Sequence, residues 1–266
     1  MLDRLPAPAG SPAYALLMLA GLALGAFFWI RQSRHDSRVA LIYLAAIGGA
    51  FAGAKIAYLL SEGWLHLEAE ERWLHWLTGK SVTGALLGGW AAVEGAKKVL
   101  GYTRTTGDRY ALVVPLGLIL GRLGCLAHGC CQGVPCDLGP LSRTSPDGTA
   151  TWPAVPVEIL FNLIAFLMVL QLRRGRVLTG QHFHLYLVAY GLFRFGHEFL
   201  RDTPKPFGGV SGYQVLALVL AGAGLLAFRR RARSHFPAEI SPNSSEDITG
   251  LSRRKDDCPA AVKTPE

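Results

Sequence analysis

Residues 153–172 read PAVPVEILFNLIAFLMVLQL and are followed directly by Arg173, Arg174 and Arg176. The run is long enough to cross a bilayer as a helix, which takes about 20 mostly apolar residues. Its one ionisable residue is Glu158, and the arginines that follow end it at a charged boundary. A water-soluble core does not need an apolar run of this length, so the stretch predicts a transmembrane helix.

The same pattern recurs along the 266-residue chain, of which 50% is hydrophobic. Apolar runs close to bilayer length cover residues 13–30, 39–60, 81–96, 110–127, 153–172, 183–200 and 212–228. We therefore expect an all-α membrane protein, a bundle of about seven transmembrane helices. Residues 1–228 are expected to form the membrane domain. Residues 229–266 are basic and polar, which predicts a disordered cytoplasmic tail.

Lysine and arginine predict the orientation, because loops on the cytoplasmic side carry more of them. One side of the predicted bundle receives Arg31, Arg34, Arg38, Lys97, Lys98, Arg104, Arg109, Arg173, Arg174, Arg176 and the cluster from Arg229. The other side receives Arg4, Arg72, Lys80, Arg143, Arg201 and Lys205. The N-terminus is therefore predicted outside and the C-terminus in the cytoplasm. The same loop positions account for the net charge of +8, so no nucleic-acid partner is expected.

Between the second and third runs, residues 62–80 are rich in tryptophan, leucine and glutamate. A helix there would gather Trp64, Leu65, Leu67, Trp73, Leu74, Trp76 and Leu77 on one apolar face. Tryptophan prefers the boundary between lipid and water, so this segment predicts a helix lying in the interface.

Charged residues inside the predicted membrane helices include Lys55, Arg122, Glu158, Arg194 and Glu198. A charge at membrane depth costs a few kcal/mol on insertion scales, and such residues mark functional sites by default. Arg194 and Glu198 are four residues apart and could simply pair on one helix face. That pairing leaves Lys55 and Arg122 unexplained. Three cations against two carboxylates favour an anionic ligand, such as a phospholipid phosphate.

Glycines gather around Arg122, at positions 121, 124, 129 and 133. Small residues in membrane helices usually serve close helix packing. Around a buried arginine at the end of a span, they also let backbone approach a lipid headgroup. Both interpretations stay open for Gly121, Gly124, Gly129 and Gly133.

Cys125, Cys130, Cys131 and Cys136 lie close together in the sequence, with His128 among them. Disulfides suit the oxidising side on which the topology places this loop. A zinc site needs four cysteine or histidine ligands, and the run offers enough of them. A catalytic or redox thiol is the third alternative, although the spacing C-x-x-C is absent. His128 titrates near neutrality and is a candidate base, or an ordinary interfacial histidine.

These residues resemble the bacterial prolipoprotein diacylglyceryl transferase family over about residues 48–228. The strongest match is Gly121-Arg122-Leu123-Gly124 followed by His128-Gly129 and Gly133, which is similar to the family signature. The second is Tyr190-Gly-Leu-Phe-Arg194-Phe195 with Glu198, Phe199 and Arg201. Supporting matches are Gly53-Ala54-Lys55-Ile56-Ala57-Tyr58, Pro153 with Glu158, and Gln214.

The chain also departs from the family pattern. The family's His-Gly-Gly motif aligns with Thr83-Gly84-Ala85. In the signature, Cys125 and His128 stand where the family has asparagine, and Cys130 stands where it has glutamate. The chain therefore resembles a divergent branch, in which the base that activates the acceptor is not defined by the motif.

The resemblance implies an enzyme of the bacterial inner membrane. It would move the diacylglyceryl group of phosphatidylglycerol to the cysteine thiol of a prolipoprotein signal peptide, without metal or cofactor. The implied catalytic residues are Arg122, Arg194, Tyr190 and His128. The implied substrate-binding residues are Lys55, Tyr58, Gly121, Gly124, Gly129, Gly133, Glu158, Glu198 and Gln214. Two alternatives stay open: a protein of this fold with another acceptor or no catalysis, and a cysteine-rich redox or metal-binding membrane protein.

Overall fold

The computed structural model describes residues 12–34, 36–68, 72–145 and 147–235. Its α-helices are α1 (Pro12–Ser33), α2 (Ser37–Ser61), α3 (Arg72–Thr78), α4 (Val82–Val99), α5 (Gly107–His128), α6 (Ala154–Arg174), α7 (His182–His197) and α8 (Gly212–His235). Short 3₁₀ turns cover Gly63–His66, Gly139–Leu141 and Glu198–Leu200. Two short antiparallel strands, β1 (Arg143–Thr144) and β2 (Ala150–Thr151), complete the described part.

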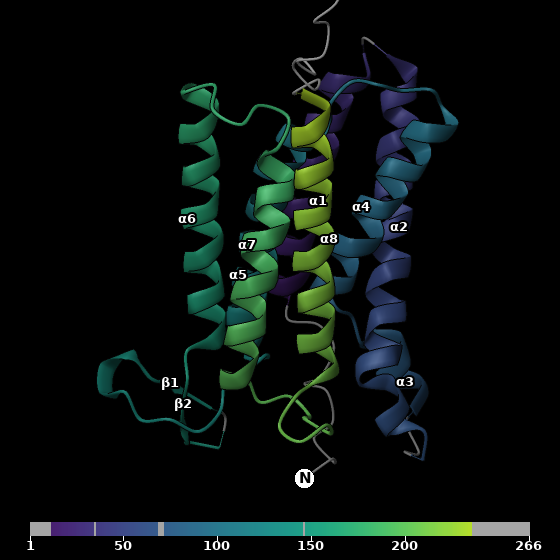
Figure 1. Cartoon of the computed structure of the whole chain (residues 1–266). Coiled ribbons are helices and arrows are strands. Elements are labelled where there is room, and N and C mark those ends of the chain that lie inside the picture. The colour runs from purple at the N-terminus through teal and green to yellow at the C-terminus, as the bar shows by residue number, and fades with distance from the viewer. Residues whose placement is uncertain (1–11, 35, 69–71, 146, 236–266) are drawn as a thin grey trace, which may run out of the picture.

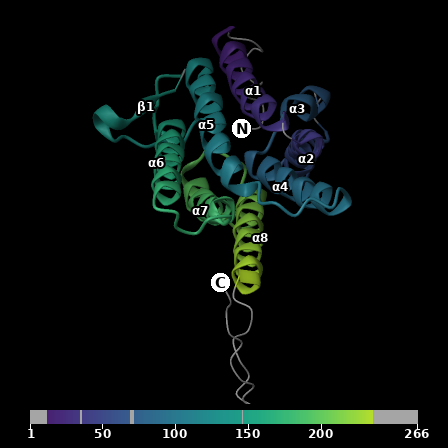
Figure 2. The same cartoon turned by 90° about the horizontal axis from the view of Figure 1, so that it is seen from above.

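The long helices run side by side as a bundle, with α6 at one edge and α2 at the other (Figure 1). Viewed along the bundle, α5, α6 and α7 gather on one side, α2 and α4 on the other, and α8 lies between (Figure 2). The small β1–β2 hairpin and α3 lie at the same end of the bundle (Figure 1). A helix is present in each of the apolar ranges predicted from the sequence.

The molecule is an all-α membrane protein. Among the described residues, α2, α5, α6 and the part of α8 up to Arg233 are each long and apolar enough to cross a bilayer, and α1 holds a shorter apolar stretch. Most of their surface faces outward, since only 17–33% of each span is buried inside the protein. Leu160, Ile164 and Met168 on α6 are more than half exposed. An apolar surface of this kind suits lipid rather than water.

Glycines set the closest helix contact, between α2 and α4. A Cβ added to Gly53 would collide with the backbone of Gly84 and Gly88, and one on Gly49 would collide with Gly88 and Ala92. Membrane helices associate through such small residues, because lipid provides no hydrophobic drive between them. This packing holds α2 and α4 together as one side of the bundle.

Two sequence-based boundaries need correction. Residues 62–80 do not form one interfacial helix: the structure has a 3₁₀ turn at Gly63–His66 and the short α3, with residues 69–71 outside the described part. The indole N–H of Trp76 donates a hydrogen bond to Gly63 O (3.0 Å) and ties the two pieces together. Helix α8 also continues beyond the predicted end at residue 228, to His235. The rest of the predicted tail, 236–266, lies outside the described residues.

Candidate functional site

Glu158 lies in the first turns of α6 and is completely buried. Its Oε1 accepts an ion-pair contact from Arg122 Nη2 on α5 (2.8 Å). Its Oε2 lies 3.5 Å from Arg194 Nη1 on α7 and 3.8 Å from Arg201 Nη1 in the segment that follows. One carboxylate therefore faces three guanidinium groups, which come from three different parts of the chain.

Glu198, also completely buried, is the second carboxylate of this cluster. Its Oε2 lies 2.7 Å from Arg194 Nη2 and 3.7 Å from Arg201 Nε. The hydroxyl of Thr203 donates a hydrogen bond to its Oε1 (2.7 Å). The five ionisable residues Arg122, Glu158, Arg194, Glu198 and Arg201, together the arginine cluster, carry a surplus of one positive charge. Burial in low dielectric makes such a surplus costly unless an anion balances it.

Helix α7 positions its part of the cluster through its periodicity. Tyr190, Arg194 and Glu198 follow each other at four-residue spacing, so they share one face. The hydroxyl of Tyr190, which is fully buried, donates to Glu158 Oε1 (3.1 Å). One turn earlier, Tyr186 donates to Asn162 Oδ1 on α6 (2.8 Å). These bonds fix α7 against α6 and hold the carboxylate of Glu158 between the arginines.

Several buried donors of the cluster have no hydrogen-bond acceptor among the described residues. They are Arg194 Nη1 and, on Arg201, both Nε and Nη1. Glu158 Oε2 does not satisfy them, since 3.5 and 3.8 Å are too long for well-formed hydrogen bonds. An unsatisfied buried donor costs free energy that a bound acceptor would recover. The cluster is thus suited to an oxyanion with several acceptor oxygens.

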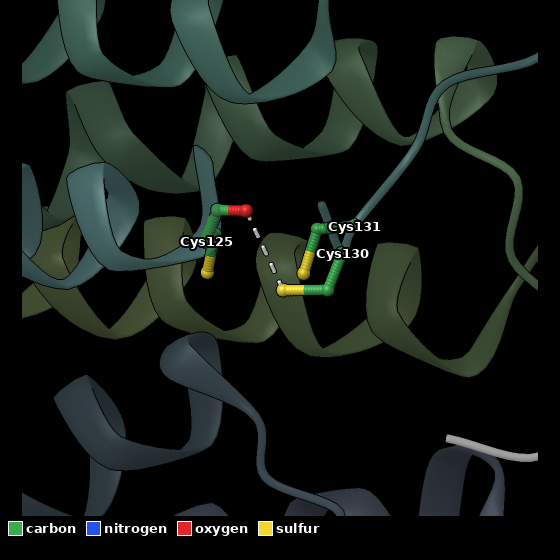
Figure 3. A group of neighbouring side chains, drawn as sticks. All are labelled: Cys125, Cys130 and Cys131. Atoms are coloured by element: carbon green, nitrogen blue, oxygen red, sulfur yellow. Dashed lines mark hydrogen bonds between the residues drawn. The ribbon is translucent and has the colours of Figure 1, made fainter. Parts of the chain in front are cut away.

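Cysteines lie against the same arginines. Arg122 Nη1 approaches Cys131 Sγ (3.6 Å) and Cys125 Sγ (3.8 Å). The side chains of Cys130 and Cys131 extend from the loop toward Cys125 at the end of α5 (Figure 3). Hydrogen bonds from the thiols of Cys125 and Cys130 hold the pKa of Cys131 well below its usual value, and Arg201 and Arg122 lower it further, against the effect of burial. Cys131 is therefore a thiolate candidate.

The disulfides favoured by the sequence are not formed. Cys125, Cys130, Cys131 and Cys136 are all free and half-buried. The prediction assigned the oxidising side to this loop but had no information on the distance between the sulfurs or on their neighbours.

The loop after α5 is joined to the segment after α7. Gly133 pairs with Arg201 as an isolated β-bridge, and Val134 N donates to Leu200 O (3.1 Å). A Cβ on Gly133 would collide with the backbone and side chain of Trp152 and approach Leu200 O to 3.0 Å. Gly133 is thus required for close backbone contact, and this contact brings Arg201 to the cysteines.

The other predicted glycines have different surroundings. Gly129 caps α5 in a left-handed conformation (φ 77°), which suits glycine. Gly121 has room for a Cβ, with Met18 Sδ at 3.9 Å, and Gly124 is buried in α5. His128 is the last residue of α5 and is half-buried.

Three predicted substrate-binding residues have structural contacts of their own. Lys55 Nζ donates to the carbonyls of Trp76 (2.9 Å), Leu77 (2.5 Å) and Gly79 (3.0 Å), at the C-terminal end of α3. An ammonium group has three N–H donors, so these bonds use them all. In this structure Lys55 contacts the backbone at the end of α3, whereas Arg201 lies with Arg122 and Arg194 around Glu158.

Tyr58 and Gln214 also lie in local packing arrangements. The ring of Tyr58 covers Gly79, where a Cβ would collide with it. Gln214 is completely buried and caps the start of α8: its Oε1 accepts from Ser211 N (2.8 Å), and its Nε2 donates to Phe195 O (3.4 Å). Neither set of contacts includes the arginine cluster.

Arg201 is a member of the cluster that is absent from the predicted site residues. The sequence places it at the end of a span and within the second family match, and the structure leaves it only 7% exposed. Its position three residues after Glu198 and seven after Arg194 was the available signal, because both spacings return to the same helix face.

An apolar cavity lies along α5. A cavity of ≈ 430 Å³, lined mainly by apolar side chains of α1, α2, α4, α5 and α7, extends along α5 as far as Leu118. Leu118 is four residues before Arg122 and therefore lies one turn away on the same helix face. The cavity therefore ends one helical turn before Arg122 and extends away from the cluster, toward Lys97, Thr106 and Arg231.

The chain is similar in sequence to known proteins. Residues 9–230 match the family model described as prolipoprotein diacylglyceryl transferase. The chain is similar to proteins named phosphatidylglycerol–prolipoprotein diacylglyceryl transferase from two bacteria. That of Rhodospirillum rubrum is 31% identical, over 88% of this chain and 97% of the relative. That of Bordetella bronchiseptica is 32% identical, over 83% of this chain and 92% of the relative. The chain therefore belongs to the prolipoprotein diacylglyceryl transferase family.

Proposed function

We propose that this protein transfers the diacylglyceryl group of phosphatidylglycerol to the lipobox cysteine thiol of prolipoproteins. The observation that carries the proposal is the surplus positive charge of the arginine cluster, together with its unfilled N–H donors. Family membership points to the same reaction.

The chemistry needs such a site. The thiolate of the acceptor attacks the glyceryl carbon, the bond from carbon to phosphate oxygen breaks, and glycerol phosphate leaves with additional negative charge. Donors already in place where this charge develops lower the barrier, because no reorganisation is needed during the reaction. Guanidinium groups suit phosphate oxygens through paired N–H donors. We assign Arg122, Arg194 and Arg201 to the leaving phosphate, with Glu158, Glu198 and Tyr190 as positioning residues.

The membrane arrangement follows the same proposal. We infer seven transmembrane helices (α1, α2, α4, α5, α6, α7 and α8), with the N-terminus outside and the C-terminus in the cytoplasm of a bacterial inner membrane. The arginine-rich ends of α6 and α8 support this orientation. The arginine cluster, α3 and the β1–β2 hairpin would then lie toward the outer side, where a signal peptide presents its cysteine. The cavity along α5 would hold acyl chains of the donor lipid.

One observation favours the alternative of the same fold with another acceptor or without catalysis. Thr83, which occupies the position of the family's histidine, is buried and cannot act as a base near neutral pH. The proposal therefore needs a source of the acceptor thiolate other than this position.

The test uses the full chain in nanodiscs with phosphatidylglycerol and a lipobox peptide, and measures the mass gained by the peptide cysteine. The wild type is expected to add one diacylglyceryl group per peptide. Arg122→Lys keeps the buried charge but loses the paired donors, so the rate should fall by about a hundredfold or more. Arg104→Lys, an exposed position before α5, is the matched control and should react like the wild type. A folded wild-type protein that adds no mass, or an Arg122→Lys variant as fast as its control, would contradict the proposal.

A further inference from the structure

Three cysteine thiols converge at the edge of the arginine cluster. The Sγ atoms of Cys125, Cys130 and Cys131, here called the cysteine triad, all lie within 4.8 Å of one another. A zinc ion bound by thiolates at about 2.3 Å with tetrahedral angles sets sulfurs roughly 3.8 Å apart. Rotation of the side chains by about an ångström would therefore close the triad around one metal ion.

The backbone of the loop brings the triad together. Cys125 lies in the last turn of α5, and the left-handed Gly129 turns the chain back toward it. Cys130 and Cys131 are adjacent, yet both side chains face the end of α5 (Figure 3). Cys131 itself has φ 63°, a conformation that residues other than glycine seldom adopt. Such strain persists only where surrounding contacts impose it, and it gathers at functional sites.

A buried guanidinium group lies against the cysteine triad. Arg122 Nη1 faces two of the sulfurs, and Arg122 is itself only 7% exposed. A guanidinium beside a sulfur favours the thiolate, which is the form that binds metal. Three thiolates and one Zn²⁺ carry a net charge of −1. The guanidinium group of Arg122, which faces two of the sulfurs, would stabilise this negative charge.

We propose that Cys125, Cys130 and Cys131 bind one zinc ion, whose fourth coordination position receives the thiol of the acceptor cysteine. Three protein ligands with one open position are the pattern of catalytic zinc, whereas structural zinc has four. Thiolate ligands select zinc among the common divalent ions, and zinc undergoes no redox change that would consume the thiols. The site departs from the sequence-based expectation of no metal.

The second half of this proposal rests on the proposed function, and it provides the missing route to the thiolate. A thiol bound to zinc loses its proton outright, so no protein base is needed at that step. The bound sulfur then forms a bond to the glyceryl carbon as the bond from that carbon to phosphate oxygen breaks. The electron pair of the broken bond leaves on glycerol phosphate beside the arginines, and the thiol proton passes to solvent. The thioether product carries no charge and is a weaker ligand, which favours its release.

The experiment uses the full chain, purified in detergent under reducing conditions and freed of metal by a chelator. Zinc is then titrated against a chromogenic chelator, and Co²⁺ replaces zinc in a parallel sample to report sulfur ligation by its charge-transfer absorption. We expect one ion per chain for the wild type and for Cys136→Ser, the matched control outside the triad. Cys131→Ser and the double variant Cys125→Ser/Cys130→Ser should lose the ion and the cobalt–sulfur band. Circular dichroism checks that each variant is folded.

Other results would overturn the site. Zinc bound equally by the triad variants would be adventitious. Absence of stoichiometric zinc in the reduced wild type, or a disulfide within the triad in freshly isolated protein, would also reject it.

The mass assay with phosphatidylglycerol and lipobox peptide separates this inference from the proposed function. Transfer that needs zinc and is lost in Cys131→Ser supports both. Transfer that continues undiminished in metal-free protein rejects the zinc site and keeps the transferase. One zinc per chain without transfer, in folded and zinc-loaded protein, keeps the site and rejects the transferase.

Discussion

Replacing Glu158 by glutamine isolates the charge balance on which the site depends. The substitution keeps the shape of the side chain and removes one negative charge from between three guanidinium groups. The buried surplus then rises from +1 to +2. Removing one partner of a buried ion pair costs about 3–5 kcal/mol, because the remaining charge stays desolvated. We therefore expect the ratio of folded to unfolded protein to fall roughly a hundredfold to several thousandfold.

Helix α4 offers a matched control for this prediction. Glu94 pairs with Lys97 at 3.1 Å, close to the 2.8 Å between Glu158 and Arg122, but its side chain is 42% exposed whereas that of Glu158 is 0% exposed. Exposed ion pairs contribute about 0–1 kcal/mol. Because the side chain of Lys97 is only 10% exposed, Glu94→Gln should cost somewhat more than this, but less than Glu158→Gln, which removes a carboxylate from among three guanidinium groups. The two substitutions are chemically identical and differ in burial.

The measurement is unfolding of the full chain by increasing SDS in mixed micelles, followed by circular dichroism. Glu158→Gln should unfold at a clearly lower SDS fraction than Glu94→Gln. The double variant Glu158→Gln/Arg201→Gln restores the surplus to +1 and should recover part of the loss, since residues of one network are coupled by about 0.5–3 kcal/mol. Equal unfolding midpoints for the two single variants would refute the reasoning, because buried charge would then not govern the stability of this region.

Three further substitutions test the roles that the contacts suggest. Gly133→Ala, whose Cβ would collide with Trp152, should lower the rate of lipid transfer at least tenfold. Gly95→Ala, an exposed position with open space around its Cβ, should not, and equal rates would show that the loop adjusts freely. Lys55→Met removes three hydrogen bonds to the end of α3 and should lower the midpoint of thermal unfolding, while the transfer rate stays within a few fold of the wild-type rate. A hundredfold loss of rate would instead indicate that Lys55 binds the headgroup. Tyr190→Phe should lower the free energy of unfolding by about 1 kcal/mol in the same SDS titration, because the hydrogen bond to the buried Glu158 carboxylate is lost. An unchanged unfolding midpoint would show that the Tyr190 hydroxyl does not help to position Glu158.

The sequence predicts which residues share a face of one helix. Tyr190, Arg194 and Glu198 could be placed on one face because each follows the last by four residues. The apolar runs located the long helices for a similar reason, since backbone in lipid must satisfy its own hydrogen bonds. Contacts that depend on chain reversal were not readable. The spacing of Arg201 from Glu198 was visible, but its pairing with the loop at Gly133 was not.

Lys55 shows a second limit of the sequence. Its position within an apolar helix indicated a residue that needs partners. The sequence does not show that residues 76–79 return to α2 and present their carbonyls to its ammonium group. A buried charge in the sequence therefore predicts that a partner exists, but tertiary structure decides whether that partner is protein backbone or ligand.

Two of the residues that depart from the family pattern lie close together in the structure. Thr83 replaces the histidine of the family's motif, and the cysteines at 125 and 130 replace an asparagine and a glutamate of its signature. Cys125 and Cys130 meet Cys131 beside Arg122, so thiols lie at the arginines of a chain that has threonine at position 83. A membrane enzyme that joins sulfur to carbon must hold a thiolate and an anionic leaving group within one small site. Metal-bound thiolate and clustered guanidinium groups meet both needs, and neither requires a titrating histidine.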